Sequence, residues 1–423
     1  MARALLRLAL AASAVAMVGL APAAYAASMP TVTPTKETID RKPAGTNDAD
    51  DPSFWVHPTD PSKSLVITAV KEAGIDVFRP DGSLVQTVSI PSNSRYNNID
   101  VIYGVSLGGS SRDLAVVSDR DTDKLHIFAI DGNAADPLTE VTSSSAPLVF
   151  GTTKKINSKT TYGLATWRNP DNGNGEVFVT QENTTNLAKL KLTDAGGGKV
   201  SYQKVATASL PAQFSGADYG LPNNTTWKPC FNAKHPDWEA HAEGMVVDPA
   251  TGTLWLDQEV VGLWKMTTDL TSPQLVHKLT RFGQKYSTST GKCVIDKSST
   301  SYGESHLPGD LEGISLYRAG TGSDGYLIIS NQNASLYTVF SRDGQSYLGS
   351  FTIGAGSGID AVQATDGLDV INVPMGSQYP QGLLVTQDGK DTPEAGTNFK
   401  FTPWQNVAGA LGLKVATSGT PRG

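Results

Sequence analysis

Cysteine and histidine are scarce in this sequence, and charged residues are few for its length. Among 423 residues there are 2 cysteines and 6 histidines, and 18% of the residues are charged. Two cysteines cannot build a four-ligand structural zinc site by themselves. The sequence also lacks an HExxH motif, which excludes the zinc metalloproteases that depend on it.

Long apolar runs are absent beyond the first residues. Arg3 and Arg7 flank an apolar run over 8–20, and residues 24–26 read Ala-Tyr-Ala, the pattern of a cleavage site. We expect residues 1–26 to be a secretory signal peptide and the protein to be secreted and extracellular. No later segment approaches the length of a membrane span, so we expect no membrane partner.

Positive charge is also under-represented. The formal net charge is −7, which argues against nucleic acid as a partner, because nucleic-acid-binding surfaces carry excess Lys and Arg. An acidic surface suits an extracellular protein that binds cations. The 42 glycines and 24 prolines indicate many turns and few helices.

Strand-like runs alternate with turn sequences along most of the chain. Clear examples are the runs 64–70, 124–130, 176–181, 254–258 and 336–341. Hairpin-type turns containing Asp-Gly or Asn-Gly separate many of them. The first convincing amphipathic helix pattern is 404–413. The sequence therefore predicts an all-β fold.

Six of the predicted strands begin with a side chain that can bind a ligand, and a glycine follows four of these side chains. The six residues are Asp51, Asn98, Tyr162, Glu243, Glu312 and Asp366. They recur roughly every 50–80 residues, about the length of a four-stranded unit with its loops. Such a repeat predicts a six-bladed β-propeller with these side chains around one opening. A large sandwich or two small β domains are the alternative folds.

No linker-like segment divides the repeats, so we expect one domain over 48–415. A polar N-terminal linker over 27–47 would precede it, and a flexible tail over 416–423 would follow. Two connections are unusually long, 211–242 and 281–308, and each contains one cysteine. In an oxidising compartment Cys230 and Cys293 are expected to form a disulfide bond, which would tie the two loops together beside the opening.

Carboxylates cluster at the strand starts. The clearest are Asp48, Asp50, Asp51, Glu243, Glu259, Asp310, Glu312, Asp360 and Asp366. Converging carboxylates repel one another unless cations are bound. Calcium accepts many oxygen ligands in loose geometry, so the pattern favours several Ca²⁺ ions.

Two basic residues stand at matching strand ends in successive repeats. They are Lys71 and Arg120. A single basic residue at a strand end is usually an ordinary surface residue. Two of them beside a carboxylate cluster indicate an anionic ligand, with Arg forming a bidentate contact to a phosphate.

At this point an ordered set of motifs resembles the β-propeller phytases. The set comprises 48–58, 97–101, 243–245, 310–314, 325–330, 365–370, 387–389 and 398–400. Each motif alone is weak, whereas the ordered set is specific. The resemblance implies a six-bladed propeller, calcium dependence and 3-phytase activity.

The resemblance also implies roles for individual residues. The calcium-filled opening would be lined by Asp50, Tyr162, Glu243, Glu259, Asp310, Glu312, Gln332 and Asp366. The catalytic residues would be Tyr162, Glu243, Glu259, Asp310, Glu312 and Asp366. The substrate-binding residues would be Lys71, Arg120, Tyr162, Gln332 and Glu182. One structural calcium would be held by Asp51 with the carbonyls of Pro52 and Ile99, and another by Asp360 and Asp391.

The chain departs from the family pattern at the outer phosphate site. Gln181 stands where the family has a lysine, and Glu72 follows Lys71 where a second lysine is frequent. Candidates for the missing cation are Lys155, Lys159, Arg168 or a residue of the long loops.

These observations predict a monomeric calcium-dependent phytase. Its substrate would be phytate (myo-inositol hexakisphosphate), taken as a calcium complex, and a calcium-activated water would attack phosphorus directly. One alternative is another calcium-dependent propeller hydrolase, such as a lactonase or a phosphotriesterase-like enzyme. The other is a non-enzymatic calcium-binding propeller.

Overall fold

The structure is a computed structural model that describes residues 29–42, 48–152, 159–320, 322–393, 395–416, 419 and 421. The expected signal peptide and most of the expected C-terminal tail lie outside the described residues. In the described part of the chain, no helix is long and apolar enough to cross a membrane.

Six sheets form the blades of the propeller. Blade 1 contains β3 (Pro52–Trp55), β4 (Leu65–Val70), β5 (Gly74–Phe78) and β6 (Leu84–Val88). Blade 2 contains β7 (Tyr96–Leu107), β8 (Ser110–Asp119), β9 (Lys124–Ile130) and β10 (Leu138–Glu140). Blade 3 contains β11 (Thr161–Arg168), β12 (Gly175–Gln181), β13 (Asn186–Gly196) and β14 (Lys199–Ser209).

The remaining blades come from the second half of the chain. Blade 4 contains β17 (Ala242–Asp248), β18 (Thr253–Gln258), β19 (Gly262–Thr267) and β20 (Gln274–Lys278). Blade 5 contains β23 (Leu311–Arg318), β24 (Gly325–Asn331), β25 (Leu336–Ser341) and β26 (Tyr347–Ile353). Blade 6 contains β27 (Leu368–Ile371), β28 (Leu383–Asp388) and β29 (Asn398–Pro403). Short 3-10 helices are η1 (Pro61–Lys63), η2 (Ala217–Tyr219) and η3 (Gln332–Ala334).

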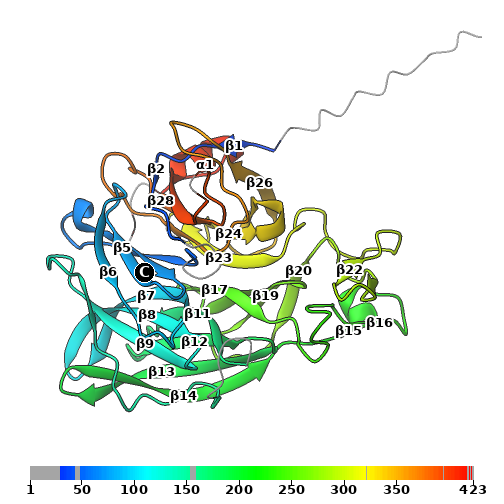
Figure 1. Cartoon of the computed structure of the whole chain (residues 1–423), viewed down its shortest axis with the longest axis horizontal. Helices are drawn as coiled ribbons and strands as arrows, with labels where there is room; N and C mark the ends of the chain where they lie inside the picture. The colour runs from blue at the N-terminus through cyan, green and yellow to red at the C-terminus, as the bar shows by residue number, and fades with distance from the viewer. Residues whose placement is uncertain are drawn as a thin grey trace, which may run out of the picture.

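The first strand of each blade lies at the centre of the molecule. Neighbouring contacts run from β3 to β7, β11, β17, β23 and β27, and β27 returns to β3. The chain colour in Figure 1 follows the same circuit, with β7, β11, β17 and β23 near the middle. The closed ring confirms the predicted six-bladed propeller.

The core is divided among the interfaces between blades. Each of the six apolar clusters in the described residues joins two neighbouring blades; for example, Phe178 of blade 3 packs in one cluster with Leu256 of blade 4. Inner strands are therefore covered on both faces, and all six residues of β4 are buried. Outer strands face solvent, and no residue of β6 is buried. A blade cannot bury its faces alone, so stacking supplies the core.

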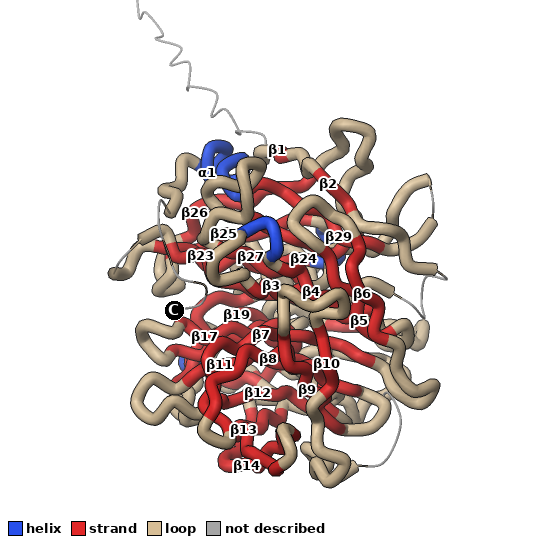
Figure 2. The backbone as a smooth tube through the Cα atoms, turned by 90° about the vertical axis from the view of Figure 1, so that its left-hand side faces the viewer, coloured by secondary structure: helices blue, strands red, loops and turns tan. Residues whose placement is uncertain are grey.

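The N-terminal segment expected to be a linker instead joins the propeller over its described residues, 29–42. β2 (Lys36–Glu37) pairs antiparallel with β29 and completes blade 6. β1 (Thr31–Val32) pairs parallel with β26 and widens blade 5. Figures 1 and 2 both show β1 beside the C-terminal helix α1 (Trp404–Leu411). The open edge of β29 supplies unpaired backbone groups, and β2 satisfies them.

The two long loops are linked as expected. Cys230 and Cys293 form a disulfide bond, which confirms that prediction. Each loop carries a small hairpin, β15 (Phe214–Ser215) with β16 (Thr226–Trp227) and β21 (Tyr286–Ser287) with β22 (Val294–Ile295). Phe282 packs against Phe214 and Trp227, with ring centroids 5.2 and 4.5 Å away. The loops therefore form an apolar platform of their own beside blade 4.

Candidate functional site

The glycine that follows a ligand-capable residue allows neighbouring inner strands to approach closely. A Cβ atom at Gly163 would lie 1.9 Å from the carbonyl oxygen of Glu243. The corresponding distances are 2.8 Å from Gly244 to Glu312, 3.0 Å from Gly313 to Asp366 and 2.6 Å from Gly367 to Asp50. Each glycine thus abuts the backbone of the next blade's ligand residue, and no larger residue fits there without a shift.

The same positions interrupt the strand register. β11, β17 and β23 each shift register between their first residue and the residue three positions later. β7 shifts between Tyr96 and Ile99. Such bulges re-aim a side chain that would otherwise alternate across the sheet. Here the re-aimed residues include Tyr162, Glu243 and Glu312, so the bulges bring their side chains to one opening.

Glu243 lies at the centre of the site. Its Oε2 accepts a hydrogen bond of 2.5 Å from the Tyr162 hydroxyl, and its Oε1 accepts one of 2.6 Å from Asn97 Nδ2. One group of oxygens within 4.8 Å of one another comes from Glu243, Glu259 and Glu312. A second group comes from Glu243, Asp50 and Asp366. All five of these carboxylates are buried, and Glu243 belongs to both groups.

Burial and mutual repulsion make this set of carboxylates costly in the absence of cations. Burial first, and then the charges of neighbouring carboxylates, raise the pKa of Glu259, Glu312 and Asp366 well above the usual range. Oδ2 of Asp50 is buried and accepts no hydrogen bond from the described residues. Such an all-oxygen donor set fits a hard divalent cation such as calcium, which would neutralise these charges.

Two basic side chains border the carboxylates. Nζ of Lys71 lies 3.4 Å from Asp50 Oδ1 and 3.8 Å from Asp366 Oδ2. Burial lowers the pKa of Lys71, but Asp50 and Asp366 outweigh that effect and raise it. Lys71 therefore keeps its positive charge at the opening, as its place at the end of β4 predicted.

Arg120 lies over the Tyr162 ring, with its guanidinium carbon 4.5 Å from the ring centroid. It donates a 2.7 Å hydrogen bond to Asn97 Oδ1 and contacts the buried carboxylate of Glu182. The structure thus places Glu182 as a partner of Arg120. The substrate contact expected for Glu182 stays a prediction.

The expected structural calcium ligands also converge. Asp51, Pro52 and Ile99 line a cavity of about 20 Å³ at the centre of the ring, together with Asp100 and Asp369. That volume suits one water or ion. Burial and the charges of Asp50, Asp369 and Asp100 raise the pKa of Asp51, and Ile99 N donates to its Oδ2 over 3.1 Å. The residues fit a single buried cation.

The second expected structural site already contains a positive charge. Nζ of Lys400 is fully buried and lies 2.5 Å from Asp360 Oδ1 and 2.6 Å from Asp391 Oδ1. Glu37 lies 2.5 Å away and Asp388 3.3 Å away. The sequence pattern identified the two aspartates but not the lysine between them. A calcium ion there would compete with the ammonium group, so this site stays a prediction.

Asp310 and Gln332 lie together at the rim. Gln332 N donates a 2.9 Å hydrogen bond to the carbonyl oxygen of Asp310. The carboxylate of Asp310 contacts Arg281 and Asn333. The carboxylate of Asp310 is therefore paired with Arg281, a basic residue of the long loop 281–308.

His241 lies against the carboxylates of the site, at Glu259. Its Nδ1 accepts a 2.7 Å hydrogen bond from Asn183 N, so the neutral ring carries its proton on Nε2, which contacts Glu259 Oε1. Burial lowers the pKa of His241 to about 4, so the ring stays neutral. Phe231, next to the disulfide, packs on the same ring at 4.5 Å.

Other functional candidates had little sequence signal. Asp257 is fully buried, and burial with the charges of Glu243 and Glu259 raises its pKa well above the usual range. Arg281 lies in an irregular loop, and such a loop has no strand or helix pattern from which the direction of the Arg281 side chain could be predicted. A strand pattern could have indicated Asp257, because it precedes Gln258 at the end of β18.

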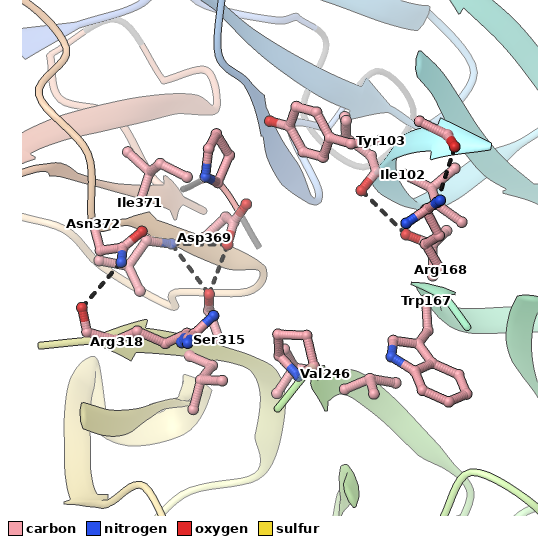
Figure 3. A pocket seen from close by; sticks show the side chains of 18 of the residues that line it. Ile102, Tyr103, Trp167, Arg168, Val246, Ser315, Arg318, Asp369, Ile371 and Asn372 are labelled. Carbon is pink, nitrogen blue, oxygen red and sulfur yellow. Dashed lines mark hydrogen bonds between the residues drawn. The ribbon is translucent and has the colours of Figure 1, made fainter. Parts of the chain in front are cut away.

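Arg168, one candidate for the missing phosphate-binding cation, lies at the opposite end of the propeller's centre from the carboxylates. A cavity of about 470 Å³ is lined by the C-terminal parts of inner strands, including Arg168, Val246 and Arg318. Figure 3 shows Arg168 and Arg318 on the walls of this cavity. Tyr162 is the second residue of β11 and Arg168 is the last, so the two residues lie at opposite ends of the strand. Lys155 lies outside the described residues.

Comparisons with known proteins agree with this geometry. The family described as Phytase matches residues 1–220 and 233–419. The chain is 30% identical to the 3-phytase of Bacillus subtilis (strain 168) over 375 residues, which cover 87% of this chain and 82% of that protein.

Two solved structures are also similar, at low sequence identity. A luciferin-regenerating enzyme matches with a TM-score of 0.45 and 11% identity, over 91% of this chain and 99% of that one. Regucalcin from Agrobacterium tumefaciens str. C58 matches with a TM-score of 0.46 and 10% identity, over 93% of this chain and 98% of that one. The family match and the curated relative show that this chain belongs to the phytase family.

Proposed function

We propose that this protein is a secreted, calcium-dependent 3-phytase that releases inorganic phosphate from phytate. The proposal depends on one observation. Two clusters of three buried carboxylates share Glu243, and Lys71 and Arg120 border them. Phytate is a polyanion, so an acidic site can attract it only through cations. The disulfide supports an oxidising, extracellular location.

The residues that would hold calcium are those of the two oxygen groups, Asp50, Glu243, Glu259, Glu312 and Asp366. Bound there, calcium would neutralise the phosphate and lower the pKa of a bound water that attacks phosphorus. Imidazole and thiolate ligands are absent from both groups, which favours calcium over zinc.

The chain's own residues would orient the phosphoryl group. Lys71 and Arg120 would stabilise the charge on its equatorial oxygens. Asn97 and Glu182 hold the Arg120 guanidinium from behind, and the Tyr162 ring supports its face. His241 donates to Glu259 and thereby fixes its carboxylate. No serine or histidine nucleophile is required.

Arg281 is our candidate for the missing outer lysine. Its guanidinium lies against Asp310; burial lowers the pKa of Arg281, while Tyr286, Glu259 and Glu312 act in the opposite direction. Because substrate phosphates would compete with Asp310 for this cation, Arg281 can serve an outer phosphate group. Arg281→Gln should raise KM for phytate more than it lowers kcat. Arg168→Gln, at the opposite end of β11, is the matched control and should leave both constants unchanged.

One assay tests the proposed activity against its alternatives. Phosphate release from phytate is measured with Ca²⁺ and after chelation, beside lactone and phosphotriester substrates. Calcium-dependent release of phosphate from phytate is the expected result. Hydrolysis of a lactone or phosphotriester alone would identify a different propeller hydrolase, and no turnover of any substrate would favour a binding protein.

A further inference from the structure

A cluster of two histidines and one glutamate lies outside the carboxylate opening. We propose that His277, Glu304 and His306 form a site for a borderline divalent transition metal such as Zn²⁺. His277 is on β20 of blade 4, and the other two residues lie at the end of the long loop 281–308. None of the three belongs to the calcium site proposed above.

The three ligand atoms already face one another. Nδ1 of His277 lies 2.7 Å from Glu304 Oε2, and Nε2 of His306 lies 2.8 Å from the same oxygen. One ligand atom from each residue lies within 4.8 Å of the other two. A zinc ion binds nitrogen at about 2.0–2.1 Å and carboxylate oxygen at about 2.0–2.2 Å. Such an ion fits between the three atoms if the Glu304 carboxylate moves back slightly.

The outer partners of these side chains favour metal ligation. Nε2 of His277 donates a 2.7 Å hydrogen bond to the carbonyl oxygen of Gly344. With Nε2 donating to a backbone carbonyl, Nδ1 is the nitrogen that would bind a metal, as in many metal-bound histidines. Here Nδ1 donates to Glu304 Oε2 over 2.7 Å, and a metal would replace that proton. Lys278 N donates to Glu304 Oε1 over 3.3 Å, which leaves Oε2 directed at the two imidazoles.

His306 supplies the second imidazole. Its Nε2 is buried and lies 2.8 Å from Glu304 Oε2, the contact that a bound metal would replace. The His306 ring stacks on Tyr347 at 4.4 Å, and the His277 ring stacks on Phe340 at 4.1 Å. Both imidazoles are thus held in place by aromatic rings of blade 5, so little side-chain entropy is lost on binding.

The donor set distinguishes this site from the carboxylate opening. Two imidazole nitrogens and one carboxylate oxygen suit zinc and its neighbours in the transition series, whereas calcium prefers oxygen alone. Three protein ligands leave the fourth tetrahedral position for water. The two sites should therefore bind different metals from the same solution.

The position of the cluster suggests what the metal does. Thr280 N donates to the carbonyl oxygen of Leu307, and Thr280 Oγ1 donates to that of Glu304, so these residues close the base of the long loop. Arg281 is the next residue after Thr280. A metal at the cluster would fasten this loop base to β20 of blade 4, as the disulfide links the same loop to the other long loop.

Zinc uptake in excess calcium tests the site. The full chain, saturated with Ca²⁺, is titrated with ZnCl₂ by calorimetry, and retained zinc is counted by elemental analysis after desalting. We expect one zinc per chain. His306→Gln and Glu304→Gln should weaken zinc binding by at least about tenfold. His126→Gln is the matched control, because His126 also contacts two carboxylates but has no second histidine beside it.

Cobalt provides a readout that does not depend on variants. Co²⁺ added to the calcium-saturated chain should show the intense visible absorption of a tetrahedral site, and zinc should abolish it. Phytate turnover measured on His306→Gln checks that the variant folds. Failure of the wild-type chain to retain zinc, or equal zinc uptake by His306→Gln and Glu304→Gln, would overturn the proposal. If the wild-type chain retains zinc but releases no phosphate from phytate, the result would count against the proposed function alone.

Discussion

At the scale of the residue, Glu243 connects every part of the candidate site. It belongs to both carboxylate groups, accepts from Tyr162 and Asn97, and contributes to the raised pKa of Glu259 and Glu312. Its position was predicted from the strand-start pattern. Its partners were not, because Asn97 and Tyr162 are separated from it by 146 and 81 residues.

Glu243→Gln should therefore lower turnover severely and leave the fold intact. The amide keeps the shape of the side chain but removes the negative charge shared by both cation positions. We expect kcat on phytate to fall by at least about a hundredfold. Glu140→Gln, at the exposed edge of blade 2, is the control for the same chemical change. Turnover close to wild type would remove Glu243 from the site.

His126 gives a prediction for pH and stability. Burial lowers its pKa, but hydrogen bonds to Asp119 and Glu140 outweigh burial and raise the pKa to about 9. The folded state therefore binds this proton more tightly than the unfolded state. The resulting stabilisation is complete below about pH 6.5 and is lost as pH rises through about 9.

Urea unfolding at about pH 6 and about pH 10 measures this contribution. Wild type should lose on the order of 3 kcal/mol more stability between these pH values than His126→Gln. His235→Gln, an exposed histidine, should behave like wild type. Identical pH dependence of wild type and His126→Gln would show that the two carboxylates do not raise the pKa of His126.

At the scale of the element, the inner strands are built around glycine and bulges. The sequence showed that a glycine follows four of the ligand residues, and the structure explains why. Each glycine faces the backbone of the ligand residue in the next blade, so close approach at this end of the ring brings the carboxylates together. Repetition along the chain indicated six strands, but not that the glycines form the contacts between them.

Gly163→Ala should test this contact directly. A Cβ at this position would lie 1.9 Å from the carbonyl oxygen of Glu243, so β11 and β17 must separate. We expect a loss of about 2 kcal/mol or more in the free energy of unfolding, with weakened activity because Glu243 moves. Gly409→Ala on α1 meets nothing within 4 Å and should be neutral or slightly stabilising. Equal stability of the two variants in urea unfolding would contradict the packing argument.

At the scale of the whole molecule, the candidate cation sites draw ligands from several blades. Asp50 and Asp51 directly precede blade 1, Glu243 and Glu312 belong to blades 4 and 5, and Asp366 directly precedes blade 6. Cations bound at this ring would hold the blades together in the way that the six apolar clusters do. The N-terminal strands β1 and β2 add outer strands to blades 5 and 6.

Chelation with EDTA should therefore lower the melting temperature as well as abolish activity. Ions that bind only the folded state stabilise it by mass action, by about 2.7 kcal/mol per site at a hundredfold excess over Kd. Scanning calorimetry of the chelated and calcium-loaded protein measures the shift, and added Ca²⁺ should restore both properties. Activity that survives exhaustive chelation would contradict the proposed metal chemistry.

The sequence by itself determined the all-β fold, the six ligand-bearing strand starts, the disulfide and the oxygen-rich chemistry. These depend on local period, turn residues and composition, which a sequence shows directly. Only the tertiary structure decided that Glu243 is shared, that Lys400 lies between Asp360 and Asp391, and that Arg168 faces away from the site. It also decided that the expected linker forms strands. Those facts depend on contacts between residues far apart in the chain, which arise only when the ring closes and the bulges aim each side chain.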